Sequence, residues 1–191
     1  DLDPPDAVLE PDVRGLDVAM HQPNVVRARQ ARAHLHADPR HLAAGERLSA
    51  SVAGYDQSRA ALQAALARGV IDRAAGSVAE AVDGAQAVFV AAPVGVLPGL
   101  VGEALAAAGD DCVVSDVGST KRAIVAAHDD SRFVGGHPLA GAETAGVEHA
   151  RADLFDGATW YLTPGASTSG MLYERLHRLL YGLGARPTAI D

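Results

Sequence analysis

From about residue 49 onward, short apolar runs alternate with stretches of helical pattern, and this alternation restricts the fold more than any other feature. The clearest run covers 87–92 (Ala-Val-Phe-Val-Ala-Ala) and ends at Pro93. A continuous run of this kind is typical of a central parallel strand that is covered on both faces. Strands that alternate with helices of roughly ten residues indicate βαβ units. The sequence therefore predicts an α/β fold built on a doubly wound parallel sheet.

The same pattern gives an approximate order of elements. Strands are expected at 51–56, 87–92, 112–116, 132–137, 159–163 and 185–190. Helices are expected at 59–68, 78–82, 97–108, 121–128 and 169–183. Open sheets of this class bind their ligands at the carboxyl ends of the strands. The candidate site residues are therefore those that end the expected strands.

Residues 1–45 differ in character from the rest of the chain. They are rich in Asp, Pro, Arg and His, show no sustained period and contain five prolines, which interrupt any long element. We expect an irregular or disordered extension over 1–45, in place of a complete first βαβ unit, and a dinucleotide-binding domain over 46–191. Two hypotheses for the extension stay open: a shifted reading frame of a GC-rich gene, or a genuine but divergent segment. A G-x-G-x-x-G motif in another frame of the coding DNA would favour the first.

Composition argues against several classes of function. The net charge is −8 and no dense Lys/Arg cluster is present, so we expect no nucleic-acid partner. No apolar stretch reaches the roughly 18 residues that a membrane span requires. The single cysteine, Cys112, can form neither an internal disulfide nor a cysteine-pair zinc site, and we expect no metal. A buried thiol in a reducing cytoplasm fits this cysteine usage.

Asp56 ends the first expected strand of the domain. In a dinucleotide-binding fold, an acid at this point accepts hydrogen bonds from the adenosine ribose and repels the 2′-phosphate of NADP. The alternative is that Asp56 only caps the helix that begins near Ser58. The glycine-rich turn that should stand about 20 residues earlier is missing, because Gly15 and Gly45 are the only glycines before Gly54.

Two further motifs stand at strand ends. Residues 115–121 (Ser-Asp-Val-Gly-Ser-Thr-Lys) end an apolar run and open a helix, where N–H groups and a hydroxyl can hold a polar ligand. An ordinary Ser/Thr N-cap is the alternative. In the second motif, two glycines that permit close packing against a ligand precede His137, and Pro138 keeps that histidine extended. An imidazole suits general acid–base catalysis because it titrates near neutral pH; a structural histidine is the alternative.

Together these segments resemble the prephenate dehydrogenase family and the related arogenate and cyclohexadienyl dehydrogenases. The resemblance covers about 51–191 and rests on the matching segments 54–56, 115–121, 132–141, 154–155, 160 and 162–164. It implies a cytoplasmic enzyme that oxidises and decarboxylates prephenate to 4-hydroxyphenylpyruvate with NAD, a step of tyrosine biosynthesis. It also implies a homodimer formed through a helical C-terminal domain. We expect that domain to lie outside these 191 residues, so that the chain is a fragment that is inactive alone.

The resemblance assigns roles to six residues. His137 matches the catalytic histidine that draws off the proton of the substrate hydroxyl. Ser119 matches the serine that aligns this hydroxyl with the nicotinamide, and so contacts both substrate and cofactor. Glu143 matches a position that shapes the substrate pocket. The remaining matches concern the cofactor alone: Asp56 favours NAD over NADP, and Ala92 and Pro93 belong to the loop that lies against the dinucleotide.

Other interpretations stay open at this point. Arogenate is the alternative substrate. A dehydrogenase of the 6-phosphogluconate-like group shares the general fold, and activity on a β-hydroxyacid would favour it. A Rossmann-like remnant without cofactor would be stably folded and fail to bind NAD.

Overall fold

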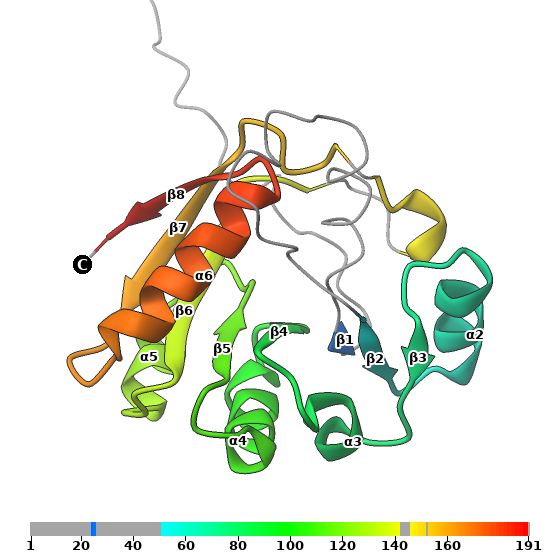
Figure 1. The fold of residues 1–191 in the computed structure, drawn as a ribbon, viewed down its shortest axis with the longest axis horizontal. Coiled ribbons are helices and arrows are strands. Elements are labelled where there is room, and N and C mark those ends of the chain that lie inside the picture. Colours follow the sequence, from blue (N-terminus) through cyan, green and yellow to red (C-terminus); the bar gives the residue numbers. More distant parts are fainter. Residues whose placement is uncertain (1–23, 26–50, 142–145, 152, 191) are drawn as a thin grey trace, which may run out of the picture.

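The computed structural model describes residues 24–25, 51–141, 146–151 and 153–190 (Figure 1). Within these ranges one sheet runs in the order β3-β2-β1-β4-β5-β6-β7-β8. Its strands are β1 (Asn24–Val25), β2 (Ala53–Asp56), β3 (Arg73–Ala74), β4 (Ala87–Ala91), β5 (Val113–Asp116), β6 (Phe133–Pro138), β7 (Thr159–Pro164) and β8 (Arg186–Ala189). The helices are α2 (Arg59–Ala67), α3 (Val78–Val82), α4 (Leu97–Ala107), α5 (Arg122–Ala127), α6 (Gly170–Gly182) and the short 3₁₀ helix η3 (Val147–His149).

The strand order confirms the predicted fold class. The order 3-2-1-4-5-6 is that of a dinucleotide-binding sheet, and β2, β4, β5 and β6 run parallel to one another. Two places depart from a fully parallel sheet. The two-residue β1 pairs antiparallel with both β2 and β4. At the other side β7 pairs antiparallel with β6, and β8 runs parallel to β7.

Both faces of the sheet are covered, as the continuous apolar run of β4 predicts. Side chains alternate along a strand, and β4 therefore supplies two cores. Val88 and Val90 pack with α3, α4 and α5 on one face. Phe89 packs with Trp160 and with α6 on the other face. Among the described residues, no helix is long and apolar enough to cross a membrane.

Helix α6 shows why the periodic pattern located the helices well. Its buried residues Leu172, Leu176, Leu179 and Leu180 follow the i, i+4, i+7, i+8 spacing of one helical face. That apolar stripe packs against β7, and α6 crosses the sheet in front of β6 and β7 in Figure 1. The expected helix 169–183 agrees with α6 to within one residue at each end.

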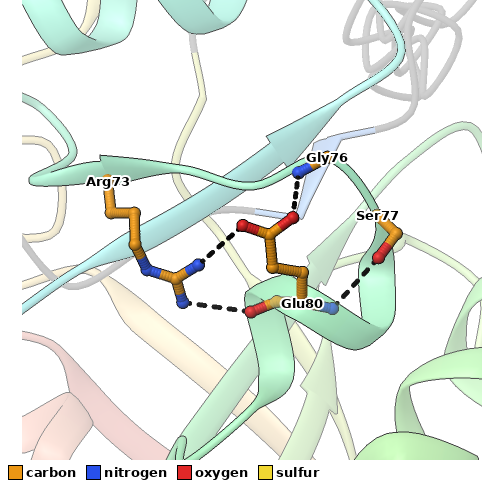
Figure 2. Close-up of polar contacts among 4 residues, drawn as sticks. All are labelled: Arg73, Gly76, Ser77 and Glu80. Atoms are coloured by element: carbon orange, nitrogen blue, oxygen red, sulfur yellow. Dashed lines mark hydrogen bonds and ion pairs between the residues drawn. The ribbon is translucent and has the colours of Figure 1, made fainter.

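The start of α3 is fixed by a compact polar network (Figure 2). Ser77 Oγ accepts a hydrogen bond from the Glu80 amide at 3.1 Å. Glu80 Oε2 accepts from the Gly76 amide at 2.7 Å, while Arg73 donates to both Glu80 Oε1 and the Glu80 carbonyl. This arrangement resembles a capping box, in which side chains at the N-cap and N3 satisfy free amides. It ties β3 to α3 at the outer part of the sheet.

We expect Ser77→Ala to lower the free energy of unfolding by about 1 kcal/mol, because the Glu80 amide loses its acceptor. Unfolding in urea, followed by circular dichroism, measures the change. Ser77→Asp is the matched control, since a carboxylate keeps an acceptor at the N-cap. An alanine variant as stable as the aspartate variant would show that this cap contributes nothing.

Candidate functional site

Five of the six predicted site residues lie at one edge of the sheet, where the parallel strands β2, β4, β5 and β6 end. Asp56 is the last residue of β2, and Ala92 and Pro93 directly follow β4. Ser119 lies in the loop after β5, and His137 is the fifth residue of β6. In an open α/β sheet, this edge is where ligands bind. The structure thus brings together the parts of the chain that the sequence singled out.

Asp56 is buried, with 6% of its surface exposed. Its Oδ1 accepts a hydrogen bond from the Ser58 amide at 2.6 Å. Burial raises the pKa of the Asp56 carboxyl, and the Ser58 amide acts in the opposite direction. The cap of α2 is Ser58, whose Oγ accepts from the Ala61 amide at 3.2 Å. Asp56 is therefore not the helix cap, and the alternative role considered for it belongs to Ser58.

A groove of about 530 Å³ lies between the end of β2 and the first turns of α4. Its lining residues are Gln57, Pro93, Gly95, Val96, Gly99, Leu100 and Glu103. The volume lies within the roughly 300–1,000 Å³ of small-molecule sites. The apolar wall is provided by Pro93, Val96 and Leu100, and polar side chains stand at the rim. Gln57, the residue after Asp56, lines this groove, which makes the groove the candidate site for the adenosine end of a dinucleotide.

The pyrophosphate end of a dinucleotide finds a weaker match in this sequence. A glycine-rich turn lets the backbone approach the phosphates closely. The segment 26–50, which precedes β2, contains Gly45 alone and lies outside the described residues. The described edge therefore offers a candidate groove for the adenosine end, and nothing in the printed sequence before Gly54 matches the glycine motif.

Asp116, the last residue of β5, is the polar centre of the edge. Its side chain is fully buried. Oδ1 accepts from the Gly136 amide at 3.1 Å, and Oδ2 accepts from the Gly118 amide at 2.9 Å. Oδ2 also forms an ion pair with the Lys121 ammonium. No role was assigned to Asp116 or Lys121 from the sequence. The available signal was an acid at the end of a buried strand with a lysine five residues later.

The loop after β5 does not form the Ser/Thr cap considered as an alternative. The N-cap position of α5 is Lys121, which makes no side-chain capping bond. Ser119 is exposed in the loop, three residues before the helix begins. Its hydroxyl is thus presented at the carboxyl edge rather than used inside the helix.

His137 is partly buried on β6, opposite Tyr161 in the register with β7. Burial is the largest cause that lowers its pKa from the ordinary value of 6.5. The nearby Lys121 charge lowers the pKa further, and Asp116 opposes the shift. The lowered pKa therefore favours the neutral imidazole at neutral pH. A neutral imidazole at a strand end can accept a proton from a ligand hydroxyl.

The glycines of this region pack against protein rather than against a ligand, which corrects the expectation for the two that precede His137. A Cβ on Gly136 would lie 2.5 Å from the Asp116 carbonyl oxygen and 2.6 Å from Ser115 Oγ. A Cβ on Gly135 would lie 3.1 Å from Lys121 Cδ. Local sequence cannot distinguish a gap filled by a ligand from one filled by a neighbouring strand.

The connection from β6 to β7 reaches α2, which joins β2 and β3 at the other end of the strand order (Figure 1). Val147 of η3 packs against the apolar cluster of Val52, Ala65 and Ile71. Arg68, which follows α2, donates a hydrogen bond to the Glu148 carbonyl at 3.0 Å. Glu143 belongs to this connection but lies outside the described residues. Among the described residues, no group of His, Cys, Asp and Glu side chains could hold a metal ion.

Comparison with known proteins gives consistent results. The family model for the nucleotide-binding domain of prephenate dehydrogenase matches residues 44–189. Prephenate dehydrogenase of Bacillus subtilis is 39% identical over 141 residues, which are 70% of this chain and 38% of that protein. Cyclohexadienyl dehydrogenase of Zymomonas mobilis is 32% identical over 123 residues, 62% of this chain and 42% of that protein. The chain thus spans less than half the length of these relatives.

Solved structures show the same likeness. The crystal structure of prephenate dehydrogenase from Aquifex aeolicus superposes with a TM-score of 0.73 at 25% identity, and the match covers 85% of this chain and 56% of that one. The Aquifex aeolicus enzyme in complex with hydroxyphenyl propionate and NAD+ gives a TM-score of 0.71 at 26% identity, with the same coverage.

Proposed function

Since this chain belongs to the prephenate dehydrogenase family through its nucleotide-binding domain, we propose that it serves NAD-dependent oxidative decarboxylation of prephenate to 4-hydroxyphenylpyruvate. The observation that carries the proposal is the position of His137 at the carboxyl end of β6, where burial lowers the pKa of its imidazole. It is linked through Asp116 to the loop that presents Ser119. The homodimer and the cytoplasmic location implied by the resemblance stay predictions.

The proposed chemistry assigns each residue a simple task. When bound, NAD supplies the nicotinamide that takes the hydride from C4 of the substrate ring. His137 accepts the proton of the C4 hydroxyl as general base, and its lowered pKa favours the unprotonated imidazole that this step needs. The Ser119 hydroxyl orients the same substrate oxygen. Loss of the ring carboxylate as carbon dioxide leaves its electron pair in the ring, which becomes aromatic.

Cofactor binding is assigned to the β2 and β4 ends. We propose that the Asp56 carboxylate accepts hydrogen bonds from the adenosine ribose hydroxyls, while Ala92 and Pro93 form the loop against the dinucleotide. The position of Asp56 at the end of β2, directly before the groove-lining Gln57, supports this assignment. A 2′-phosphate would bring a second negative charge against the same carboxylate, which favours NAD over NADP.

The test is prephenate-dependent formation of NADH by the native protein, with arogenate as the competing substrate. Calorimetric titration of the chain with NAD measures cofactor binding separately. NADH formation that requires prephenate supports the proposal. A stably folded protein that binds no NAD, or that oxidises a β-hydroxyacid but neither cyclohexadienyl substrate, would contradict it.

We expect Asp56→Asn to weaken NAD binding about tenfold, because hydrogen bonds to a charged group are stronger than those to a neutral one. The preference for NAD over NADP should also fall about tenfold, because the charge that repels the 2′-phosphate is lost. Calorimetric titration with both cofactors gives the two affinities. Glu103→Gln is the matched control: it removes a carboxylate from the rim of the same groove. Equal changes in the two variants would show that general charge at the groove, rather than Asp56, sets the preference.

A further inference from the structure

The buried carboxylate of Asp116 accepts two amide hydrogen bonds and forms an ion pair. Its side chain has no exposed surface. Both oxygens are engaged, Oδ1 by the Gly136 amide and Oδ2 by the Gly118 amide together with the Lys121 ammonium. Burying a charge costs free energy unless it is paired and hydrogen-bonded. All three partners lie on segments next to the proposed catalytic residues.

The two amides stand in matching places. Gly118 immediately precedes Ser119 in the loop after β5, and Gly136 immediately precedes His137 in β6. Consecutive Cα atoms are held about 3.8 Å apart by the planar peptide. An acceptor that fixes both glycine amides therefore also restricts where Ser119 and His137 can lie relative to each other.

Lys121 completes the arrangement. Its ammonium pairs with Asp116, and only 13% of its side chain is exposed. A Cβ on Gly135 would lie 3.1 Å from Lys121 Cδ, so the aliphatic part of the lysine passes close over β6. Burial lowers the pKa of Lys121, whereas the ion pair with Asp116 raises it. The ion pair with Asp116 thus holds the ammonium at a place where its charge lowers the pKa of His137.

We propose that Asp116 and Lys121 form a buried positioning pair that holds the Ser119 loop and the His137 strand in one fixed arrangement. The importance of that arrangement for turnover rests on the proposed function. The pair touches neither substrate nor cofactor in this scheme and acts through the two residues that do. Among the described residues, the charged groups acting on His137 are Lys121 and Asp116, and Tyr161 of β7 stands opposite it in the sheet.

The first test measures amide hydrogen exchange by NMR in the chain itself. The double variant Asp116→Asn/Lys121→Met removes both charges and leaves no single buried ion. We expect the Gly118 and Gly136 amides to exchange about tenfold faster than in the unmodified chain, relative to the Val114 amide. Val114 is the internal reference because its amide, in the same strand as Asp116, bonds to the Arg132 carbonyl and not to the carboxylate.

The second test follows the titration of the His137 imidazole by NMR. Lys121→Gln removes the positive charge but can still donate a hydrogen bond to Asp116, and we expect the pKa of His137 to rise. Lys121→Arg restores the charge and should return the pKa toward its original low value. A lysine that served only stability would change the unfolding midpoint in these variants without moving this titration. If the double variant does not fold, Asp116→Asn/Lys121→Gln takes its place in the exchange measurement, because it removes the same carboxylate.

The proposal is overturned if Gly118 and Gly136 keep their protection relative to Val114, or if only one of them loses it. An unchanged His137 titration in Lys121→Gln would overturn the part given to Lys121. Neither measurement needs NAD or substrate. If the amides and the histidine respond as expected but prephenate is not oxidised, the proposed function fails and the positioning pair stands.

Discussion

Replacing His137 with glutamine is expected to lower kcat for prephenate-dependent NAD reduction by about 100- to 10,000-fold, the usual contribution of a positioned general base. Glutamine can still hydrogen-bond the substrate hydroxyl but cannot take up its proton. NAD affinity should be unchanged, because the groove proposed for adenosine lies at the ends of β2 and β4. Steady-state NADH formation gives kcat, and calorimetric titration gives the affinity for NAD.

The pH dependence provides an independent check of the same role. Folding lowers the pKa of His137 below 6.5, so the active neutral form persists to lower pH than for a free histidine. Activity of the unmodified protein should fall as pH decreases through that lowered pKa, and the Gln variant should lack this limb. His177→Gln, on α6, is the matched control and should behave as the unmodified protein. Substantial activity with an unchanged acid limb in His137→Gln would assign the base to another group.

The sequence patterns located best the elements whose own residues show which side chains are buried. The run 87–92 has no polar side chain and became the central strand β4, and the leucine spacing of 169–183 became α6. Strand ends follow from the same runs, which is why Asp56 and His137 were placed at the carboxyl edge. Strand direction is not encoded in such a run, and the antiparallel pairing of β7 with β6 depends on how their connection crosses the molecule.

Asp116 shows the limit of local pattern within the site. An aspartate before a glycine turn usually suggests a surface turn or cap. Its burial depends on β6, whose Gly136 comes twenty residues later and brings an amide to Oδ1. The charge of Lys121 then becomes necessary, because a buried carboxylate needs compensation. The need for these partners arises only when β5 and β6 are packed side by side. The sequence could therefore identify the end of the strand but not the ion pair between Asp116 and Lys121.

Gly136→Ala is expected to lower the free energy of unfolding by about 1–3 kcal/mol or more, the usual cost of overpacking a tight interior. Gly136 is buried, and its Cβ would meet the Asp116 carbonyl oxygen at 2.5 Å. That oxygen belongs to the backbone of β5, which is paired with both β4 and β6 and cannot move alone. Urea unfolding of the chain measures the loss, with circular dichroism at the outset to confirm that the variant folds.

Gly99→Ala in α4 is the matched control, because nothing lies within 4 Å of the added Cβ. Replacing an unhindered helical glycine by alanine should stabilise by up to about 1 kcal/mol, so the two variants should shift the urea midpoint in opposite directions. Relief of the clash in Gly136→Ala would require β6 to move away from β5, which would lengthen the hydrogen bond from the amide of residue 136 to Asp116 and displace His137. That amide should therefore exchange faster in Gly136→Ala than in Gly99→Ala or the unmodified chain. A Gly136→Ala variant as stable as Gly99→Ala would show that β5 and β6 are not held as closely as this packing requires.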